Sequence, residues 1–446
     1  MKVFEGEHQH SYSAYGERSG TNKHLEARRY YSGFEMAHDT YNALSCASDG
    51  NIYYVLSSES PHTGGKFFVY KPEHDRVEFI ADLTEICGED GLNAIPQGKS
   101  HVRFYERKGK LYFSTHVGYY EMIDGMDRLP KNPPDGRQKY PGGHFLAYDL
   151  KTKKTEDLAM VGGGEGIVSM TMDTDRGHIY GITWPTGHFV HYDLEKNSLY
   201  DLGPVSAMGE AGVPGEDFRS LCRALFVDPA DGKVYFSTAE GDIFHYCPVS
   251  GKMELEKEID LRLDYFGQYD PTVPGSMAYN WRMVCWHEPE AVAYGVHGNS
   301  GYLFRFDPRR KQIEIVQRIT SLPSQRSGMF DQFSYGYLGF GIAPHTHTVY
   351  YLTGGPIYEN GKRVGGVERI AKGAARGMEN LHLVTFDLLN RHYIDHGPIR
   401  YTDGSIPTYV NSIAIGQDGY VYALARFAHK GKVIQDLISI PDPLKD

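Results

Sequence analysis

A short apolar segment centred on a tyrosine occurs seven times along the chain. The copies are NIYYVLSS (51–58), KLYFSTHVG (110–118), HIYGITWPTG (178–187), KVYFSTAEG (233–241), VAYGVHGNSG (292–301), TVYYLTGG (348–355) and YVYALARFA (420–428). Their aligned tyrosines are Tyr53, Tyr112, Tyr180, Tyr235, Tyr294, Tyr350 and Tyr422. Spacing of this kind is typical of a chain built from repeated supersecondary units, and we expect the recurring tyrosines to lie in the core.

Each copy stands between further strand-like segments. An apolar strand and a turn precede it, and a second strand follows it, mostly ending in an aromatic residue and Asp. A fourth strand, such as RVEFIADL, comes after that turn, where the Asp side chain is expected to bond its own backbone. Four short strands in each repeat are typical of a β-propeller blade. The sequence therefore predicts an all-β, seven-bladed β-propeller with four-stranded antiparallel blades.

The last repeat ends near Pro441, before a fourth strand. We therefore expect a strand from residues 27–36 to complete it and to close the ring, because closure removes the exposed sheet edges. No charge run or low-complexity linker divides the sequence, so residues 1–446 are expected to form a single domain.

Composition excludes several classes of function. The chain has 46 Lys and Arg against 57 Asp and Glu, and this net charge of −11 disfavours nucleic acid as a partner. There is no apolar run long enough to span a membrane. Five widely spaced cysteines argue against a disulfide framework. The N-terminus lacks the apolar segment of a signal peptide, so a cytoplasmic location is expected; the alternative is a secreted or periplasmic protein whose leader has been removed.

Propeller geometry predicts which residues share a face. The start of the innermost strand and the end of the second strand of each blade should surround one mouth of the central channel. The chemically notable residues at these positions are Asn42, His101, His116, Trp184, Arg223, Arg282, His297, Tyr337, Asn411 and Arg426. Insertions at 117–143 and 354–381 should rise from the same face, and the first brings Tyr119 and Tyr120. Convergent polar groups around a concave mouth make this face the candidate functional site.

The second repeat carries the sharpest chemical signal. His101 and His116 should be adjacent, and two imidazoles can relay a proton near neutral pH. Arg223 and Arg282 should face them, and an arginine fork matches a carboxylate. β-Elimination beside a uronic acid needs these groups: Arg neutralises the carboxylate, His or Tyr removes the proton at C5, and a second His or Tyr protonates the leaving oxygen. No cofactor is required for this reaction.

Other interpretations of the same residues stay open. His101, His116 and His297 could instead hold a divalent metal such as Zn²⁺, Mn²⁺ or Ca²⁺. A glycoside hydrolase usually needs paired carboxylates, and the predicted ring has none; Glu59 and Glu240 are the nearest. A propeller that only binds glycan or protein would need no adjacent histidines. The segment GGGEG (162–166) lacks the Lys and Ser/Thr of a phosphate loop and is interpreted as a connection between blades.

Four segments resemble the seven-bladed propeller polysaccharide lyases, which include ulvan lyases and rhamnose–glucuronate lyases, with α-L-rhamnosidases on a related scaffold. The segments are GKSHVRFYERKGKLYFSTHVGYY (98–120), PGGHFLAYDL (141–150), ITWPTGHFVHYDL (182–194) and CRALFVDPADGKVYFSTAEGDIFHY (222–246).

The resemblance implies a lyase that cleaves a bond beside a glucuronate-type residue of an oligo- or polysaccharide. It implies that His101 and His116 are the paired histidines and that Arg223 neutralises the uronate, with Tyr119, Tyr120 or Tyr337 as the catalytic tyrosine. Tyr120 is the tyrosine that we include in the catalytic set. The remaining residues of the mouth are expected to bind substrate. The related rhamnosidases are reported to work from the opposite face, and a hydrolase that releases rhamnose is the alternative activity.

Overall fold

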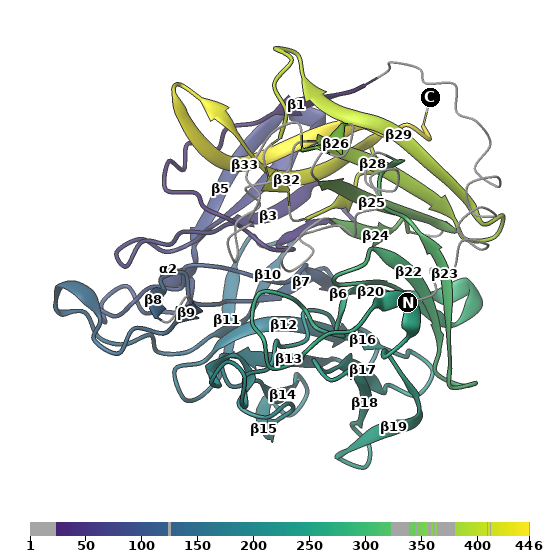
Figure 1. Ribbon diagram of the computed structural model, residues 1–446. Helices are drawn as coiled ribbons and strands as arrows, with labels where there is room; N and C mark the ends of the chain where they lie inside the picture. The colour runs from purple at the N-terminus through teal and green to yellow at the C-terminus, as the bar shows by residue number, and fades with distance from the viewer. Residues whose placement is uncertain are drawn as a thin grey trace.

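The computed structural model describes residues 24–123, 126–322, 339–344, 346–355, 358–359, 362–363, 380–407, 409–410 and 412–445. The architecture is all-β and consists mainly of four-stranded antiparallel sheets, an arrangement compatible with a propeller (Figure 1). Helices are confined to one short α-helix, α2 (Leu83–Ile86), and single 3₁₀ turns in the described part of the chain.

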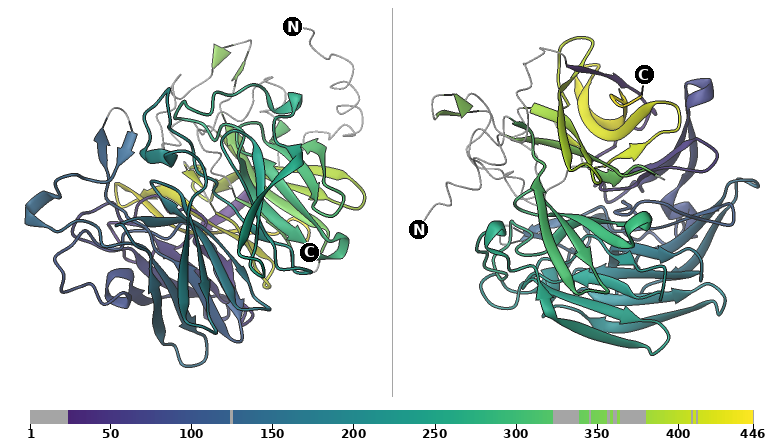
Figure 2. Two further views of the ribbon diagram at one scale, coloured as in Figure 1. Left: turned by 90° about the horizontal axis from the view of Figure 1, so that it is seen from below. Right: turned by 90° about the vertical axis from the view of Figure 1, so that its right-hand side faces the viewer.

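Five of the sheets are separate and follow one another along the chain (Figures 1 and 2). Within each, the strands pair in sequence order, as the repeats predict. They comprise β2 (Leu44–Cys46), β3 (Ile52–Leu56), β4 (Lys66–Lys71) and β5 (Arg76–Asp82); β6 (Tyr105–Arg107), β7 (Lys110–Ser114), β10 (His144–Asp149) and β11 (Thr155–Met160); β12 (Gly166–Asp173), β13 (His178–Trp184), β14 (His188–Asp193) and β15 (Ser198–Pro204); β16 (Phe226–Val227), β17 (Val234–Ser237), β18 (Asp242–Cys247) and β19 (Lys252–Asp260); and β20 (Trp281–His287), β21 (Val292–His297), β22 (Tyr302–Asp307) and β23 (Gln312–Arg318).

The last two repeats share one nine-stranded sheet. One half contains β24 (Phe340–Ile342), β25 (Thr348–Gly355), β28 (Asn380–Asp387) and β29 (His392–Tyr401), and the other β30 (Tyr409–Val410), β31 (Ala414–Ile415), β32 (Tyr420–His429) and β33 (Lys432–Pro441). The N-terminal strand β1 (Leu25–Arg29) lies between the halves (Figure 1). It pairs antiparallel with β33, through Arg28 and Ser439, and parallel with β29, through Leu25 and Ile399.

An N-terminal strand therefore completes the last repeat, as the sequence predicts, but its bounds differ from 27–36. The strand begins at Leu25 and ends at Arg29. Beyond it, the backbone and hydroxyl of Ser32 donate to the Asp436 carboxylate at 2.7 and 2.8 Å. Gly33 then adopts a positive φ of 90°, which turns the chain out of the ladder.

The repeated tyrosines lie in the core, as predicted, with exposed fractions of 0–6%. Several use the hydroxyl to tie the hairpin together: Tyr53 donates to Asp49 and Tyr294 to Glu290, each four residues earlier, at 2.8 and 2.7 Å. The aromatic–Asp ends are turns, which is also confirmed. Asp149, for example, accepts from the backbone of Lys151 and Thr152.

The second repeat departs from the predicted strand that starts at His101, because β6 contains only Tyr105–Arg107. The preceding segment instead pairs with the end of the next strand: Lys99 and His116 exchange backbone hydrogen bonds of 2.9 and 2.8 Å. Gly98 permits this approach, since a Cβ there would lie 2.4 Å from the Cα of Gly118. The segment from 98 to 104 thus lies outside the regular ladder of β6 and β7.

The first predicted insertion, 117–143, forms a hairpin of β8 (Glu121–Ile123) and β9 (Met126–Arg128). Most of the second, 354–381, lies outside the described residues; within it, β26 (Tyr358–Glu359) pairs with β27 (Lys362–Arg363). The 3₁₀ turns are η1 (Pro72–His74), η2 (Pro134–Gly136), η3 (Gly209–Ala211), η4 (Asp264–Phe266) and η5 (Glu288–Glu290). All five cysteines are free thiols. Among the described residues, no helix has both the length and the apolar character needed to cross a membrane.

Candidate functional site

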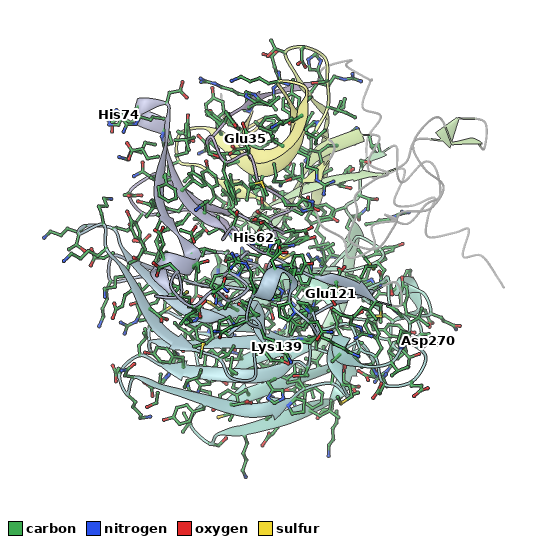
Figure 3. The ribbon with its side chains drawn as sticks, turned by 90° about the vertical axis from the view of Figure 1, so that its left-hand side faces the viewer. Glu35, His62, His74, Glu121, Lys139 and Asp270 are labelled. Carbon is green, nitrogen blue, oxygen red and sulfur yellow. The ribbon has the colours of Figure 1, made fainter. Side chains whose placement is uncertain are left out.

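A cavity of about 740 Å³ opens where the second strands of the first three repeats end. Of the residues predicted at the mouth, it is lined by His101, His116, Tyr119, Tyr120, Trp184, Arg223 and Arg426. Its volume lies within the ~300–1,000 Å³ of small-molecule sites. In Figure 3, Glu121 and Lys139 of the first insertion and His62 of a neighbouring loop lie near the centre of the view, which looks onto the side where β8 and β9 project in Figure 1. Arg137 joins these loops by donating to the His62 Nδ1 at 2.9 Å.

The two histidines of the second repeat are in contact. Their ring centroids are 4.4 Å apart, with the planes inclined by 60°. Burial is the main cause that holds the pKa of both well below 6.5, and the positive charges of Lys99 and Arg223 lower it further. Both imidazoles are therefore uncharged at neutral pH, which is the form that accepts a proton.

Tyr120 and Trp184 enclose His116. The Trp184 ring lies 5.5 Å from the imidazole centroid, and Tyr120 lies edge-on to Trp184 at 5.3 Å. The Tyr120 hydroxyl donates to the Val117 carbonyl at 2.8 Å, and burial keeps its pKa well above 10. Its proton is therefore committed to the protein backbone, which does not fit the catalytic role that the resemblance implies for it.

Arg223 is not a lone cation at the mouth. Its Nη2 donates to Glu210 Oε1 at 2.6 Å, and its Nη1 donates to the Leu221 carbonyl at 3.1 Å. The other Glu210 oxygen accepts from the Trp184 indole N–H at 2.9 Å. Glu210 thus fixes both the guanidinium and the indole, and it balances the positive charge that the sequence predicts for recognition of a uronate.

The Glu210 loop is attached to the first insertion. Arg128, at the end of β9, donates to the backbone carbonyls of Glu210 and Gly212 at 2.5 and 3.0 Å. The hairpin that carries the cavity wall and the loop that carries Glu210 are consequently held as one unit.

Lys99 is a second buried cation, and the predicted ring of strand ends does not include it. Its side chain is 2% exposed, and its Nζ bonds Glu59 Oε1 at 2.8 Å. The same Nζ lies 4.8 Å from the centroid of the Tyr120 ring, within cation–π range. Burial alone would raise the pKa of the Glu59 carboxyl, but Lys99 and a hydrogen bond from His38 outweigh it and hold that pKa well below its usual range.

Arg426 is paired in the same way. Its guanidinium makes a bidentate contact with the buried carboxylate of Asp39, with Nε–Oδ1 at 2.7 Å and a second contact from Nη2 to Oδ2. Four carboxylates therefore line the cavity, Asp39, Glu59, Asp127 and Glu210, where the predicted ring has none. A buried cation needs an opposite charge, so partners could be anticipated. They come from connecting loops, however, and the repeat alignment does not include those.

Other predicted residues lie elsewhere. Asn42 lines a second cavity, although its amide nitrogen is 3.5 Å from the His101 carbonyl oxygen. Arg282 is buried in β20, outside the first cavity, and its charge contributes to lowering the His101 pKa. Tyr337 and Asn411 lie outside the described residues. Of the two carboxylates nearest the predicted ring, Glu240 pairs with Arg219 and does not line the cavity.

His297 belongs to the core and not to this cavity. Its ring stacks on Phe266 at 4.0 Å, and its Nδ1 contacts the Ser300 hydroxyl at 2.9 Å. Burial lowers its pKa to about 3. The alternative metal set of His101, His116 and His297 is thus not assembled, and no group of three His, Cys, Asp or Glu side chains in the described part of the chain is arranged to hold a metal.

No family model matches the chain, and no curated protein does. Among solved structures, one described as a 6-phosphogluconolactonase of Bacteroides uniformis has 10% identity and a TM-score of 0.46, covering 82% of this chain and 86% of that one. A mitotic checkpoint complex chain has 10% identity and a TM-score of 0.48 over 94% and 95%. A nidogen/laminin complex chain has 10% identity and a TM-score of 0.35 over 61% and 78%. At these values the likenesses support no inference about function.

Proposed function

We propose that the protein is a seven-bladed propeller and a lyase that cleaves uronate-containing oligosaccharides by β-elimination. The seven-blade architecture is supported by the five separate four-stranded sheets and by the two antiparallel halves of the nine-stranded sheet. The lyase activity is supported by one observation: the imidazoles of His101 and His116 are in contact, in a cavity that Lys99 and Arg223 also line. An experimental structure that counts the blades tests the first part.

The reaction assigns one role to each group. An imidazole nitrogen of His101 or His116 takes the proton from C5 of the uronate. The electron pair forms a C4=C5 double bond, and the bond from C4 to the glycosidic oxygen breaks. We assign protonation of that leaving oxygen to Tyr119, which lines the cavity, because the Tyr120 hydroxyl already donates to Val117. Arg223 or Lys99 lies where it can draw negative charge from the uronate carboxylate.

The charge balance of the cavity limits the substrate. Its four carboxylates face three permanent cations, because the histidines His101 and His116 are neutral. A densely charged polyuronate would be repelled by Glu210 and Glu59 as it approached Arg223 and Lys99. We therefore propose a substrate that presents a single uronate among neutral sugars.

The hydrolase alternative gains one observation, since carboxylates do line the cavity. A glycosidase, however, needs one carboxyl group that stays protonated near neutral pH. Glu59 has a lowered pKa, and Glu210 and Asp39 are ion-paired with arginines. Glu59 is therefore ionised near neutral pH, and arginines already bind Glu210 and Asp39, so these three groups do not supply the carboxyl pair of a glycosidase and the lyase remains the better-supported activity.

The test is the ultraviolet absorbance of the unsaturated uronate, with ulvan, gum arabic fragments, arabinogalactan and oligogalacturonate as substrates. His116→Gln and His101→Gln should each abolish the signal. His188→Gln is the matched control, because His188 pairs with Asp201 on the outer strands and does not line the cavity.

Each outcome decides between activities. Release of rhamnose without a chromophore would establish the hydrolase. Glycan binding without either product would establish a binding module. Loss of activity with a chelator would show that metal chemistry replaces the proton transfer proposed for the two histidines.

A further inference from the structure

A second cavity of about 750 Å³ is present, and it opens on the opposite side from the first. Its rim is formed by turns between the first and second strands of three repeats, including Ser48, Thr346 and Gln417. The first cavity is instead lined by residues that follow the second strand of a repeat, at the other end of the hairpin, such as Glu59 after β3 and His116 after β7. The two cavities therefore occupy opposite ends of the molecule's central region.

The walls of the second cavity combine a group of apolar side chains with polar ones, which include a second cation, Lys445. Leu44, Phe104, Met283, Phe340 and Ile415 contribute side chains from the innermost strands of four repeats and from the segment before β6. Leu444, close to the C-terminus, adds to the wall. Such a lining suits the hydrocarbon part of a small molecule, because burying apolar surface is favourable.

Arg103 brings a positive charge into this cavity. Its side chain extends from the second repeat to the fifth, where Nη2 lies 3.3 Å from the Cys285 thiol. A thiol is a weak acceptor and carries no charge in its protonated form. Among the residues that the structure describes, no carboxylate lies within ion-pair distance of this guanidinium, which is half-buried.

The arginines of the two cavities differ in whether a carboxylate pairs with them. Each arginine there has a carboxylate partner at hydrogen-bond distance: Arg223 has Glu210, and Arg426 has Asp39. The carboxylate that lines the second cavity, Asp442, is bonded instead to the Tyr350 hydroxyl at 3.0 Å. An arginine against apolar walls without an opposite charge is costly, and an anionic ligand would remove that cost.

We propose that the second cavity binds a small organic carboxylate with an apolar body, and that Arg103 binds the carboxylate group. The guanidinium fork fits a carboxylate, and the apolar walls take the hydrocarbon. This site is independent of the lyase activity proposed for the first cavity, so either proposal can fail without the other.

Isothermal titration calorimetry of the full-length protein with octanoate tests the proposal. Octan-1-ol has the same chain without the charge, and it should bind more weakly by roughly tenfold to a hundredfold. Arg103→Met should weaken octanoate binding by a similar factor, because it removes the charge but keeps a long side chain. Arg107→Met is the matched control, since Arg107 donates to the Asp175 carbonyl and does not line the cavity.

Gly341→Leu provides a test that leaves Arg103 unchanged. A Cβ at Gly341 would meet nothing closer than 3.5 Å, so the backbone has room for a side chain that fills the cavity. Octanoate binding should be lost in this variant while its circular dichroism and melting curve stay close to those of the wild type. The proposal is overturned if octanoate does not bind, if octan-1-ol binds equally well, or if Arg103→Met binds octanoate like the wild type.

Discussion

Gly166→Ala tests the placement of His116 without touching the histidine. A Cβ at Gly166 would lie 2.2 Å from His116 Nδ1, 2.8 Å from Cε1 and 3.0 Å from Cγ. Ordinary contact begins near 3.4 Å, so the imidazole must move by roughly 1 Å. Gly166 does not have a positive φ, so the backbone itself accepts alanine. A displacement of this size costs about 10²-fold in rate when the displaced group does the chemistry.

Two measurements follow from this displacement. The rate of unsaturated-uronate formation should fall by about 10²-fold, and the free energy of unfolding by about 1–3 kcal/mol from overpacking. The imidazole proton resonances of His116 and its neighbour His101 should shift in the NMR spectrum, which does not depend on any substrate. Gly162→Ala is the control four residues earlier, because a Cβ there meets nothing within 4 Å.

The reasoning is refuted if Gly166→Ala shifts the His116 resonances and yet keeps the full rate. In that case His116 is in the predicted place but takes no part in the reaction. If neither the resonances nor the stability change, the contact between Gly166 and His116 is wrong.

Three further predictions concern stability in urea unfolding. The pKa of His297 is about 3 in the folded protein and about 6.5 in the unfolded chain, so its contribution to the free energy of unfolding is complete above pH 6.5 and decreases as the pH falls. At pH 5 the wild type should have lost ~2 kcal/mol from this group, and His297→Gln should not show this loss. Ala27 of β1 is 2% exposed, so Ala27→Asp buries a carboxylate and should lower the free energy of unfolding by several kcal/mol. Glu26→Ala on the exposed side of β1 should cost less than about 0.5 kcal/mol, and equal losses would contradict the closure by β1. Glu59→Gln leaves the buried Lys99 without its partner and should lower the free energy of unfolding by about 1–3 kcal/mol. Lys99→Met should cost less, because Glu59 is 40% exposed and water can solvate its carboxylate; the reverse order would show that Lys99 does not need this carboxylate.

The repeats make much of the fold predictable from sequence. The burial of the repeated tyrosine and the Asp turn after the next strand depend on local chemistry. The tyrosine occurs in every copy of the repeat, and the Asp turn occurs in most copies. The contact between His101 and His116 was predictable for the same reason, since both belong to one repeat. The start of the strand before Tyr105 was not, because the path of residues 98–104 also depends on the first repeat, where the Ser58 N–H donates to the Gly98 carbonyl at 2.8 Å.

The candidate site also contains features that the sequence predicts and features that it does not. Sequence placed Arg223, Arg426 and Trp184 at one mouth, because strand ends follow from the repeat register. It did not reveal that Glu210 and Asp39 neutralise the two arginines, since these carboxylates come from irregular segments whose paths no period describes.

Sequence by itself thus determined the strand pattern, the core tyrosines and the adjacency of two histidines, because these are set by interactions within a repeat. Tertiary structure alone decided the charge of the cavity, the exclusion of His297 from it and the position of Arg103 beside Cys285. Those properties arise from contacts between segments far apart in the chain, where a loop's path determines whether a cation meets a carboxylate, an aromatic ring or an apolar wall.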